Sequence, residues 1–272
     1  MGREGDMMIK LAVSGAGGRM GQRLLALSDQ DEEFELVQAI EWDGFPLLGK
    51  PLNFVIPLAP RAESVVWSAE LTSGADILMD FSTPESTAKN ACLAKDFGAA
   101  MIIGTTGLDE KQAQAVKAAA ESVPVMHAPN FSLGVNLLFK LAAEAARILG
   151  DGYNIEIVET HHNKKVDAPS GTALGLAKAV AGPLGRDIDS DLVHGRSGKP
   201  GKRTTREIGM HALRLGAIPG DHTIYLANDF ECLSIGHRAE SRDAFAYGAL
   251  SAAKWLCGRE PGYYSMNDML FS

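Results

Sequence analysis

The chain is poor in the features that mark secreted, membrane-spanning and nucleic-acid-binding proteins. Its 272 residues hold three scattered cysteines and no Cys-x-x-Cys pair, which is typical of reduced thiols in a cytoplasm. Lys140 interrupts the longest apolar run, residues 133–143, which is shorter than the ~18 residues of a membrane span. Asp and Glu outnumber Lys and Arg by 34 to 26, so the basic surplus of a nucleic-acid binder is missing. We therefore expect a cytoplasmic protein that binds neither membranes nor nucleic acids.

A glycine-rich turn follows the first apolar segment. Residues 8–14 predict a strand, and residues 22–27 have helical composition. Glycines between them allow a tight turn and a close approach of the backbone to a pyrophosphate at the helix N-terminus. The third glycine stands at position 21, one place later than in strict G-x-G-x-x-G spacing. The turn predicts a dinucleotide site, with a glycine turn in some other α/β protein as the alternative. It consists of Gly15, Ala16, Gly17, Gly18, Arg19, Met20 and Gly21.

Glu41 and Trp42 follow the next predicted strand, and both bear on the choice between NADH and NADPH. Glu41 stands where a dinucleotide-binding unit places the carboxylate for the adenosine ribose. Trp42 follows it, where a site for the phosphorylated cofactor commonly has Arg. A missing charge-assisted hydrogen bond costs about 1.5–3 kcal/mol, and Glu41 would repel the 2′-phosphate. We expect NADH to be preferred, with NADPH possible if Lys50 or Arg61 supplies a cation.

Strands and helices alternate as far as residue 131, which predicts a Rossmann-type, doubly wound parallel sheet. Polar turns follow three of the strands, at residues 81–83, 104–107 and 128–132. They would meet at the carboxyl ends of the strands, where such sheets bind ligands, and would line a nicotinamide pocket. The strands are expected at 34–40, 75–81, 99–103 and 123–126, and the helices at 85–97 and 109–121.

After a helical run at residues 133–149 the pattern changes to consecutive strands with few helices. This predicts a second, α+β domain built on a mixed sheet. Such a sheet leaves an edge or a face to cover, so oligomerisation through it is a hypothesis. The last helical run, 242–257, could return to the first domain. We expect a dinucleotide-binding domain of residues 1–131 plus 241–272 and a substrate-binding and oligomerisation domain of residues 132–240.

Candidate catalytic and binding side chains are most closely grouped between Ile155 and Leu174. A predicted strand leads into two histidines and two lysines, and a helix with Ser170 as its expected N-cap begins directly after them. The N–H groups and dipole of that helix start favour an anion by about 0.3–1 kcal/mol. Cations, proton donors and an anion site in one stretch indicate acid/base chemistry on a carboxylate-bearing substrate. The residues are His161, His162, Lys164, Lys165, Gly171 and Thr172.

Other interpretations compete with this one. Adjacent histidines could bind a metal, but they point to opposite faces of a strand and no Cys or carboxylate stands at ligand spacing, so we expect none. Any single lysine is more often part of a solvated loop, although here the lysines converge with the histidines and the helix start. A later loop, residues 194–206, carries five cations. We favour slightly a mobile, solvated loop there over a flap that closes on an acidic substrate.

Four stretches resemble the bacterial dihydrodipicolinate reductase family, also called 4-hydroxy-tetrahydrodipicolinate reductases. The block His-His-x-x-Lys-x-Asp-Ala-Pro-Ser-Gly-Thr is highly specific, whereas the glycine motif alone is not. The resemblance implies NAD(P)H-dependent reduction of 4-hydroxy-tetrahydrodipicolinate to tetrahydrodipicolinate in lysine and diaminopimelate biosynthesis. It also implies a homotetramer built by the central domain. The stretches are Gly15–Gly21, Gly104–Gly107, Ala128–Ser132 and Glu159–Thr172.

The resemblance assigns roles to single residues. It makes His161 the catalytic acid/base and Lys165 the proton donor, and leaves open which of them delivers the final proton. Substrate carboxylates would be held by His162, Gly171 and Thr172. Trp42 departs from the Arg of many members, which bears on NADPH use only. The implied cofactor-binding residues are Gly15, Ala16, Gly17, Gly18, Arg19, Met20, Glu41, Gly104, Thr105, Thr106, Ala128, Pro129, Asn130 and Phe131.

Two other functions compete with this one. Another amino-acid-pathway dehydrogenase, such as an aspartate or homoserine dehydrogenase, would give no joint role to His161 and Lys165. A nucleotide-binding sensor without catalysis would need no proton donor at all.

Overall fold

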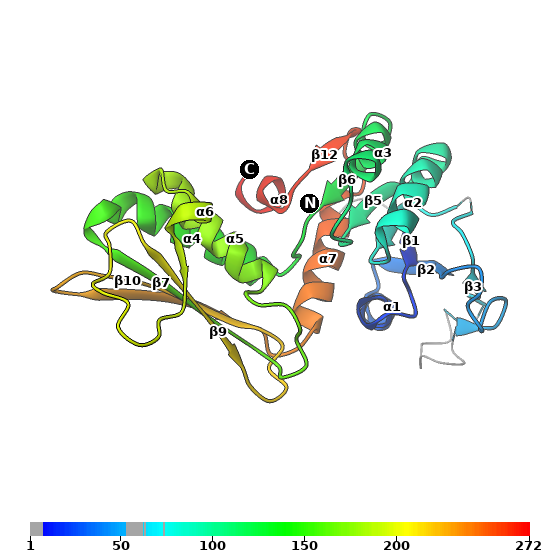
Figure 1. Ribbon diagram of the computed structural model, residues 1–272. Coiled ribbons are helices and arrows are strands. Elements are labelled where there is room, and N and C mark those ends of the chain that lie inside the picture. The colour runs from blue at the N-terminus through cyan, green and yellow to red at the C-terminus, as the bar shows by residue number, and fades with distance from the viewer. Residues whose placement is uncertain (1–7, 53–61, 63, 73) are drawn as a thin grey trace. The chain divides into compact units, whose positions relative to one another are not determined.

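The computed structural model of the chain describes residues 8–52, 62, 64–72 and 74–272. Their contacts divide the chain into two compact units. The described residues of Met1–Ser132 pack with Asp243–Ser272 in the first unit, and Leu133–Arg242 form the second (Figure 1). None of the helices in the described part of the chain has the length and hydropathy of a membrane span.

The first unit is built on seven parallel strands in the order β12-β6-β5-β4-β1-β2-β3. The chain enters the middle of the sheet at β1 (Ile9–Ser14), continues to β2 (Phe34–Ile40) on one side, and crosses to β4 (Ile77–Asp80) on the other. This reversal marks the switch point at which open α/β sheets bind ligands, outside the carboxyl ends of the strands. The other strands are β3 (Trp67–Ser68), β5 (Ala100–Ile103), β6 (Pro124–His127) and β12 (Gly262–Tyr264).

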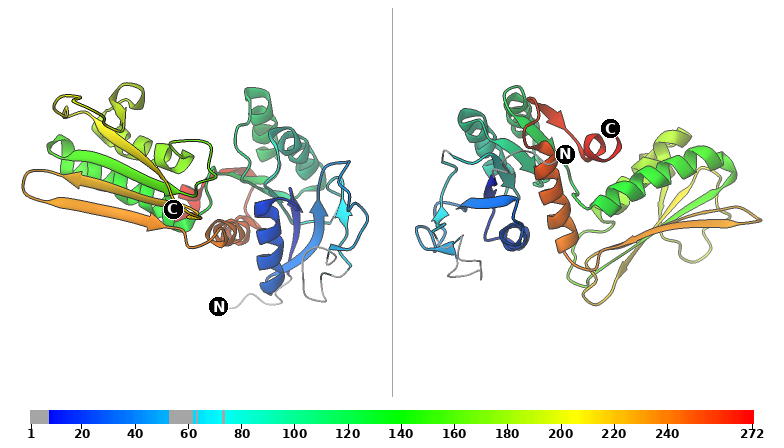
Figure 2. Two further views of the ribbon diagram at one scale, coloured as in Figure 1. Left: turned by 60° about the horizontal axis from the view of Figure 1, so that its bottom comes forward. Right: turned by 180° about the vertical axis from the view of Figure 1, so that it is seen from behind.

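Helices cover both faces of this sheet (Figure 2). On one face α2 (Pro84–Phe97) packs with α3 (Glu110–Ala120), and α1 (Arg19–Gln30) pairs with α7 (Asp243–Leu256) on the other. Every residue of β4 and β5 is buried, as expected when both faces of a parallel strand are covered. A short helix, α8 (Met266–Phe271), ends the chain.

The second unit is built on a mixed sheet in the order β11-β10-β7-β9-β8. Its central strand β7 (Asn154–His161) is antiparallel to β10 (Asp221–Ala227) and parallel to β9 (Ile208–Arg214). Buried and half-buried residues alternate along β7, so its two faces have different environments. The remaining elements are β8 (Leu192–His194), β11 (Cys232–Arg238), α6 (Ile188–Asp191) and 3-10 turns at Gly150–Gly152 and Gly182–Leu184.

One face of the mixed sheet carries the core of the second unit. Helices α4 (Leu133–Leu149) and α5 (Gly171–Ala181) cover it and pack against Ile155 and Ile157 of β7 (Figure 1). No helix of the described residues lies on the opposite face.

The predicted fold class is confirmed: a Rossmann-type parallel sheet is joined to an α+β unit with a mixed sheet. The bounds of β2 and α4 are those predicted, and α5 begins directly after Ser170. Five short elements, β3, β8, β12, α6 and α8, were missed because each is too short to show a period. Glycine and proline in residues 43–61 predict mostly loop, and residues 53–61 of that stretch lie outside the described part of the chain.

The core of the second unit can be tested at Leu176, a fully buried residue of α5. We expect Leu176→Ala to lower the free energy of unfolding by about 2–5 kcal/mol, because it removes buried methyl groups and leaves a cavity. Urea unfolding measures the change. Leu137→Ala is the control, since Leu137 of α4 is 46% exposed and should cost far less. Equal losses in the two variants would contradict this packing.

Candidate active site

A cavity of about 400 Å³ lies at the carboxyl ends of β1 and β4 in the first unit. Gly15 and Gly18 of the glycine turn line it, together with Glu41 and Trp42 beyond β2 and Lys89 of α2. This is the switch point of the sheet, where a dinucleotide is expected.

Two glycines of the turn are required by close backbone contacts. Gly15 has φ +72°, and a Cβ there would lie 2.4 Å from the carbonyl oxygen of Phe81. A Cβ at Gly21 would lie 2.2 Å from the carbonyl oxygen of Gly15. The departure from strict G-x-G-x-x-G spacing thus has a physical reason, because helix α1 touches the turn at position 21.

The turn and the end of β2 fit a dinucleotide. The N-cap of α1, Gly18, makes no side-chain cap hydrogen bond, so the helix start offers its N–H groups to an anion such as a pyrophosphate. Glu41 lines the cavity, and its carboxylate accepts a hydrogen bond from the N–H of Gly17 at 2.7 Å. That bond fixes the carboxylate beside the glycine turn.

Trp42 and Lys89 line the cavity and bear on whether it suits the 2′-phosphate of NADPH. The Trp42 side chain is 64% exposed and folds over Gly44, where a Cβ would lie 1.9 Å from the indole. The ammonium of Lys89 forms an ion pair with Glu70 at 3.0 Å. Sequence reasoning missed Lys89, because α2 is distant in the chain from the glycine turn. Arg61, the cation proposed from the sequence, lies outside the described residues.

The buried carboxylate of Asp80 holds the turns around the cavity together. It accepts hydrogen bonds from two atoms of Ser82 and from the hydroxyls of Thr87 and Thr105. Asn90 donates to it at 2.7 Å and also to Ser14 at 2.8 Å. The ends of β1, β4 and β5 are therefore joined by one network. An acid at the end of an apolar strand was the sequence signal for Asp80, and it was overlooked.

The residues predicted to border the nicotinamide lie after β5 and β6. A Cβ at Gly104 would lie 2.1 Å from the Phe81 ring, which packs at 5.7 Å from the ring of Phe131. The carbonyl of Thr105 accepts a hydrogen bond from Nε2–H of His127 at 3.0 Å. The structure thus brings Gly104 and Phe131 to the same aromatic side chain. Of the other predicted residues, Thr106 and Pro129 are exposed, Asn130 is half-buried and Ala128 is buried.

Gly21→Ala tests the turn. The new methyl group would clash with backbone, and relief of such overpacking typically costs about 1–3 kcal/mol. We expect a Kd for NADH raised about tenfold or more, measured by calorimetric titration, together with a lower melting temperature. Gly152→Ala is the control, since no atom lies within 4 Å of a Cβ there. An unchanged Kd in Gly21→Ala would contradict the role of this contact.

In the second unit, β7 presents Glu159 and His161 on its buried face. The Glu159 side chain is fully buried, and one of its oxygens lies 2.6 Å from Nδ1 of His161. Arg214, at the end of β9, donates to both carboxylate oxygens at 2.9 and 3.0 Å. The backbone N–H of Ser170 donates to it at 3.1 Å. Four donors therefore surround one buried carboxylate.

The protonation of this cluster follows from its contacts. Burial alone would raise the pKa of Glu159, but hydrogen bonds from Arg214 and His161 outweigh burial and lower it. An ionised carboxylate only accepts hydrogen bonds, so Nδ1 of His161 carries a hydrogen and Nε2 is the nitrogen that can exchange a proton with a ligand. Burial, and then repulsion from His161, lowers the pKa of His222 to about 4, so that His222 is neutral at neutral pH.

The start of α5 adjoins this cluster. Ser170 is the N-cap as predicted, and its Oγ accepts a hydrogen bond from the N–H of Ala173 at 3.1 Å. Gly171 and Thr172 form the first turn, where N–H groups and the helix dipole favour an anion. In the loop before the helix, Nζ of Lys165 bonds both oxygens of Asp167 at 2.8 and 2.9 Å. An imidazole, an ammonium and a helix start thus belong to one short segment of one unit.

Sequence reasoning missed Glu159, Arg214 and His222. Glu159 could have been found, because residues two apart on a strand share a face. Glu159 was considered only as a possible metal ligand, and not as a hydrogen-bond partner of His161. Arg214 and His222 come from neighbouring strands, and no sequence pattern predicted that pairing. Within the described ranges, no three His, Cys, Asp or Glu side chains are grouped so as to hold a metal ion.

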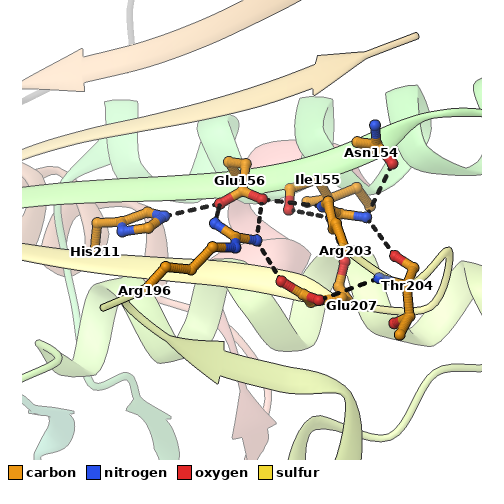
Figure 3. Close-up of polar contacts among 8 residues, drawn as sticks. All are labelled: Asn154, Ile155, Glu156, Arg196, Arg203, Thr204, Glu207 and His211. Carbon is orange, nitrogen blue, oxygen red and sulfur yellow. Dashed lines mark hydrogen bonds and ion pairs between the residues drawn. The ribbon is translucent and has the colours of Figure 1, made fainter. Parts of the chain in front are cut away.

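The opposite face of β7 carries a second ionic cluster, formed with the loop 194–206 (Figure 3). Arg196 donates two hydrogen bonds to Glu156, at 2.8 and 3.1 Å, and Arg203 donates one at 3.0 Å. His211 bonds the same carboxylate at 2.8 Å, and Arg196 also pairs with Glu207. The interpretation of this segment as a solvated loop is wrong for these arginines, because both are held in ion pairs on the sheet.

The Glu156 cluster makes stability depend on pH. Burial alone would raise the pKa of Glu156, but hydrogen bonds from Arg196, His211 and Arg203 lower it from 4.5 to about 2. A lowered pKa stabilises the fold above pH 4.5, and this stabilisation is lost as the pH falls towards 2. The shift corresponds to at most about 3 kcal/mol. We therefore expect the wild type to lose more free energy of unfolding than Glu156→Gln over this range, measured by urea unfolding. Parallel pH profiles would contradict the cluster.

Comparison with known proteins decides the family. Residues 9–131 match the family model described as dihydrodipicolinate reductase, N-terminus, and residues 134–270 match the model of its C-terminus. The chain belongs to the dihydrodipicolinate reductase family. It is accordingly an oxidoreductase, and the resemblance stated from its sequence motifs is confirmed.

Members of the dihydrodipicolinate reductase family match over nearly the whole chain. The 4-hydroxy-tetrahydrodipicolinate reductase of Syntrophotalea carbinolica is 46% identical over 268 residues, which is 97% of this chain and 99% of the relative. That of Thiobacillus denitrificans is 47% identical over 266 residues, with the same coverage of 97% and 99%. Among solved structures, a dipicolinate-bound dihydrodipicolinate reductase from Paenisporosarcina sp. TG-14 has a TM-score of 0.75 at 25% identity. It covers 97% of this chain and 100% of its own.

Proposed function

We propose that the protein reduces 4-hydroxy-tetrahydrodipicolinate to tetrahydrodipicolinate in lysine and diaminopimelate biosynthesis, with NADH as the preferred cofactor. The observation that carries this proposal is the segment from His161 to Thr172, in which an oriented imidazole, an ammonium and a helix start adjoin one another. The names of the relatives and the dicarboxylate bound to the solved neighbour support it.

In this reaction the residues from His161 to Thr172 would deliver a proton and bind two carboxylates. Loss of the 4-hydroxyl group as water would give a conjugated imine, and the nicotinamide, when bound, would supply a hydride to its electron-poor carbon. The resulting enamine must take a proton, and a positioned donor typically contributes ~10²–10⁴-fold to the rate. Lys165 would donate that proton, with His161 as the acid/base group. Gly171 and Thr172 at the helix start would bind one carboxylate, and His162 would contact the substrate beside them.

The cofactor would bind along the glycine turn of the first unit. Its pyrophosphate would lie on Gly15 to Met20, and its ribose hydroxyls would bond Glu41. The nicotinamide would be bordered by Gly104, Thr105 and Thr106 and by residues 128–131. A preference for NADH follows from Trp42, which offers no charge to a 2′-phosphate, and from the pairing of Lys89 with Glu70.

We propose that four chains associate through the face of the mixed sheet opposite α4 and α5. Its alternate residues on β7, Glu156, Val158 and Thr160, are half-buried in the single chain. Association there would cover a face that no helix of the described residues covers. A cytoplasmic location accords with the biosynthetic role and stays a prediction.

A coupled assay tests the reaction and the cofactor. Substrate is made in situ from pyruvate and aspartate semialdehyde with the preceding synthase, and oxidation of NADH and of NADPH is followed separately. We expect kcat/KM with NADH to exceed that with NADPH by about tenfold or more, since a charge-assisted hydrogen bond to the phosphate is missing. Trp42→Arg should raise kcat/KM for NADPH, whereas Trp42→Phe should not. Wild-type turnover that is equal with both cofactors would contradict the preference but not the reaction.

Lys165→Ala tests the proton donor. We expect kcat to fall by about 10²–10⁴-fold, because a positioned donor is lost, while the Kd for NADH stays unchanged. Lys164→Ala is the control, since this neighbouring lysine is exposed. Near-normal turnover by Lys165→Ala would contradict its role. Turnover of aspartate with oxidised cofactor would instead favour the rival dehydrogenase, and no turnover of any substrate would favour the sensor.

A further inference from the structure

Glu159 contacts three separate parts of the second unit, although no substrate role was expected of it. Its carboxylate accepts hydrogen bonds from His161 of the same strand, from Arg214 of the parallel neighbour β9, and from the N–H of Ser170 at the start of α5. One fully buried group therefore fixes both the imidazole and the N-cap of the helix.

Arg214 extends these contacts to the lysine loop. Besides the two bonds to Glu159, it donates to the backbone carbonyl of Asp167 at 2.7 Å. The carboxylate of Asp167 in turn holds the ammonium of Lys165. The loop that carries Lys165 is thus tied to the same carboxylate as His161.

The charges of Glu159 and Arg214 together also suit an acidic ligand. A lone buried carboxylate would repel a dicarboxylate, but the guanidinium of Arg214 binds both oxygens of Glu159 and compensates its charge. The imidazole lies against Gly220, where a Cβ would lie 3.2 Å from Nε2 of His161. The Nδ1 edge of the ring is bonded to Glu159 at 2.6 Å, and the Nε2 edge lies on the side of Gly220.

We propose that Glu159, paired with Arg214, is a positioning residue of the reductase that holds His161 in the tautomer presenting Nε2 to the substrate. The same pair holds the Lys165 loop and the start of α5 in register with that imidazole. This inference rests on the proposed function, because that function makes His161 the acid/base group beside the proton donor Lys165.

Glu156 offers a matched control on the same strand. It too is a glutamate bonded by arginines and by a histidine, Arg196, Arg203 and His211, but it lies on the opposite face of β7 (Figure 3). Glu156→Gln removes a comparable set of ion pairs without touching His161. A purely structural role for Glu159 predicts similar outcomes for the two variants, whereas a positioning role predicts different ones.

The experiment compares Glu159→Gln with Glu156→Gln and the wild type. The amide has nearly the shape of the carboxylate but only one acceptor oxygen, whereas in Glu159 one oxygen accepts from His161 and Arg214 and the other from Ser170 and Arg214. Its NH₂ group would therefore face donors on one side or the other, and the hold on His161 is weakened. We expect Glu159→Gln to lower kcat about a hundredfold, with a much smaller change in KM and no change in the Kd for NADH. Glu156→Gln should keep kcat within error, once size-exclusion chromatography has shown that both variants have the wild-type assembly.

A spectroscopic measurement reads the tautomer directly. Solid-state ¹⁵N NMR of histidine-labelled protein, with His161→Gln used to assign the signal, should show Nδ1–H in the wild type and a shift towards Nε2–H in Glu159→Gln. Unchanged kcat in Glu159→Gln, or Nε2–H in the wild type, would overturn the inference. The wild-type spectrum decides it even if the variant does not fold. If the wild type does not turn over the substrate, the proposed function fails, and the spectrum still tests the positioning of His161.

Discussion

A carboxylate that is closed off from water must be surrounded by hydrogen-bond donors, and in the second unit this requirement falls on Glu159. Removing one partner of such a buried pair typically costs about 3–5 kcal/mol, so the donors cannot leave independently. They come from β7, β9 and the start of α5. The mixed sheet is therefore joined to the helix at the point where the imidazole, the lysine loop and the helix N-terminus adjoin one another.

The first unit also has a buried carboxylate that is bonded by donors from several elements, at the carboxyl ends of its strands. Asp80 closes β4, is fully buried, and binds side chains from the turn that follows it, from α2 and from the turn after β5. Loops that follow parallel strands have no hydrogen bonds to one another by default. A shared carboxylate gives them such bonds and joins the turns around the cavity at the switch point of the sheet.

Much of this could be read from the sequence, and the misses have physical reasons. Alternation and the 3.6-residue period gave β2, α4 and the start of α5 because these elements are long and their signals are local. The specific block from His161 to Thr172 gave the family. Arg214 and His222 could not be predicted, since their contacts depend on which strands pair, and pairing is not encoded in local pattern. Lys89 reaches the cavity from a helix far along the chain for the same reason.

The most direct test of the account is a crystal structure with NADH and pyridine-2,6-dicarboxylate bound. The account predicts one ligand carboxylate on the N–H groups of Gly171 and Thr172, with Nε2 of His161 turned towards the ring and Nδ1 on Glu159. It also predicts the dinucleotide pyrophosphate on the glycine turn beside Glu41. A dicarboxylate bound away from residues 161–172, or a His161 ring whose Nε2 is bonded to Glu159, would contradict it.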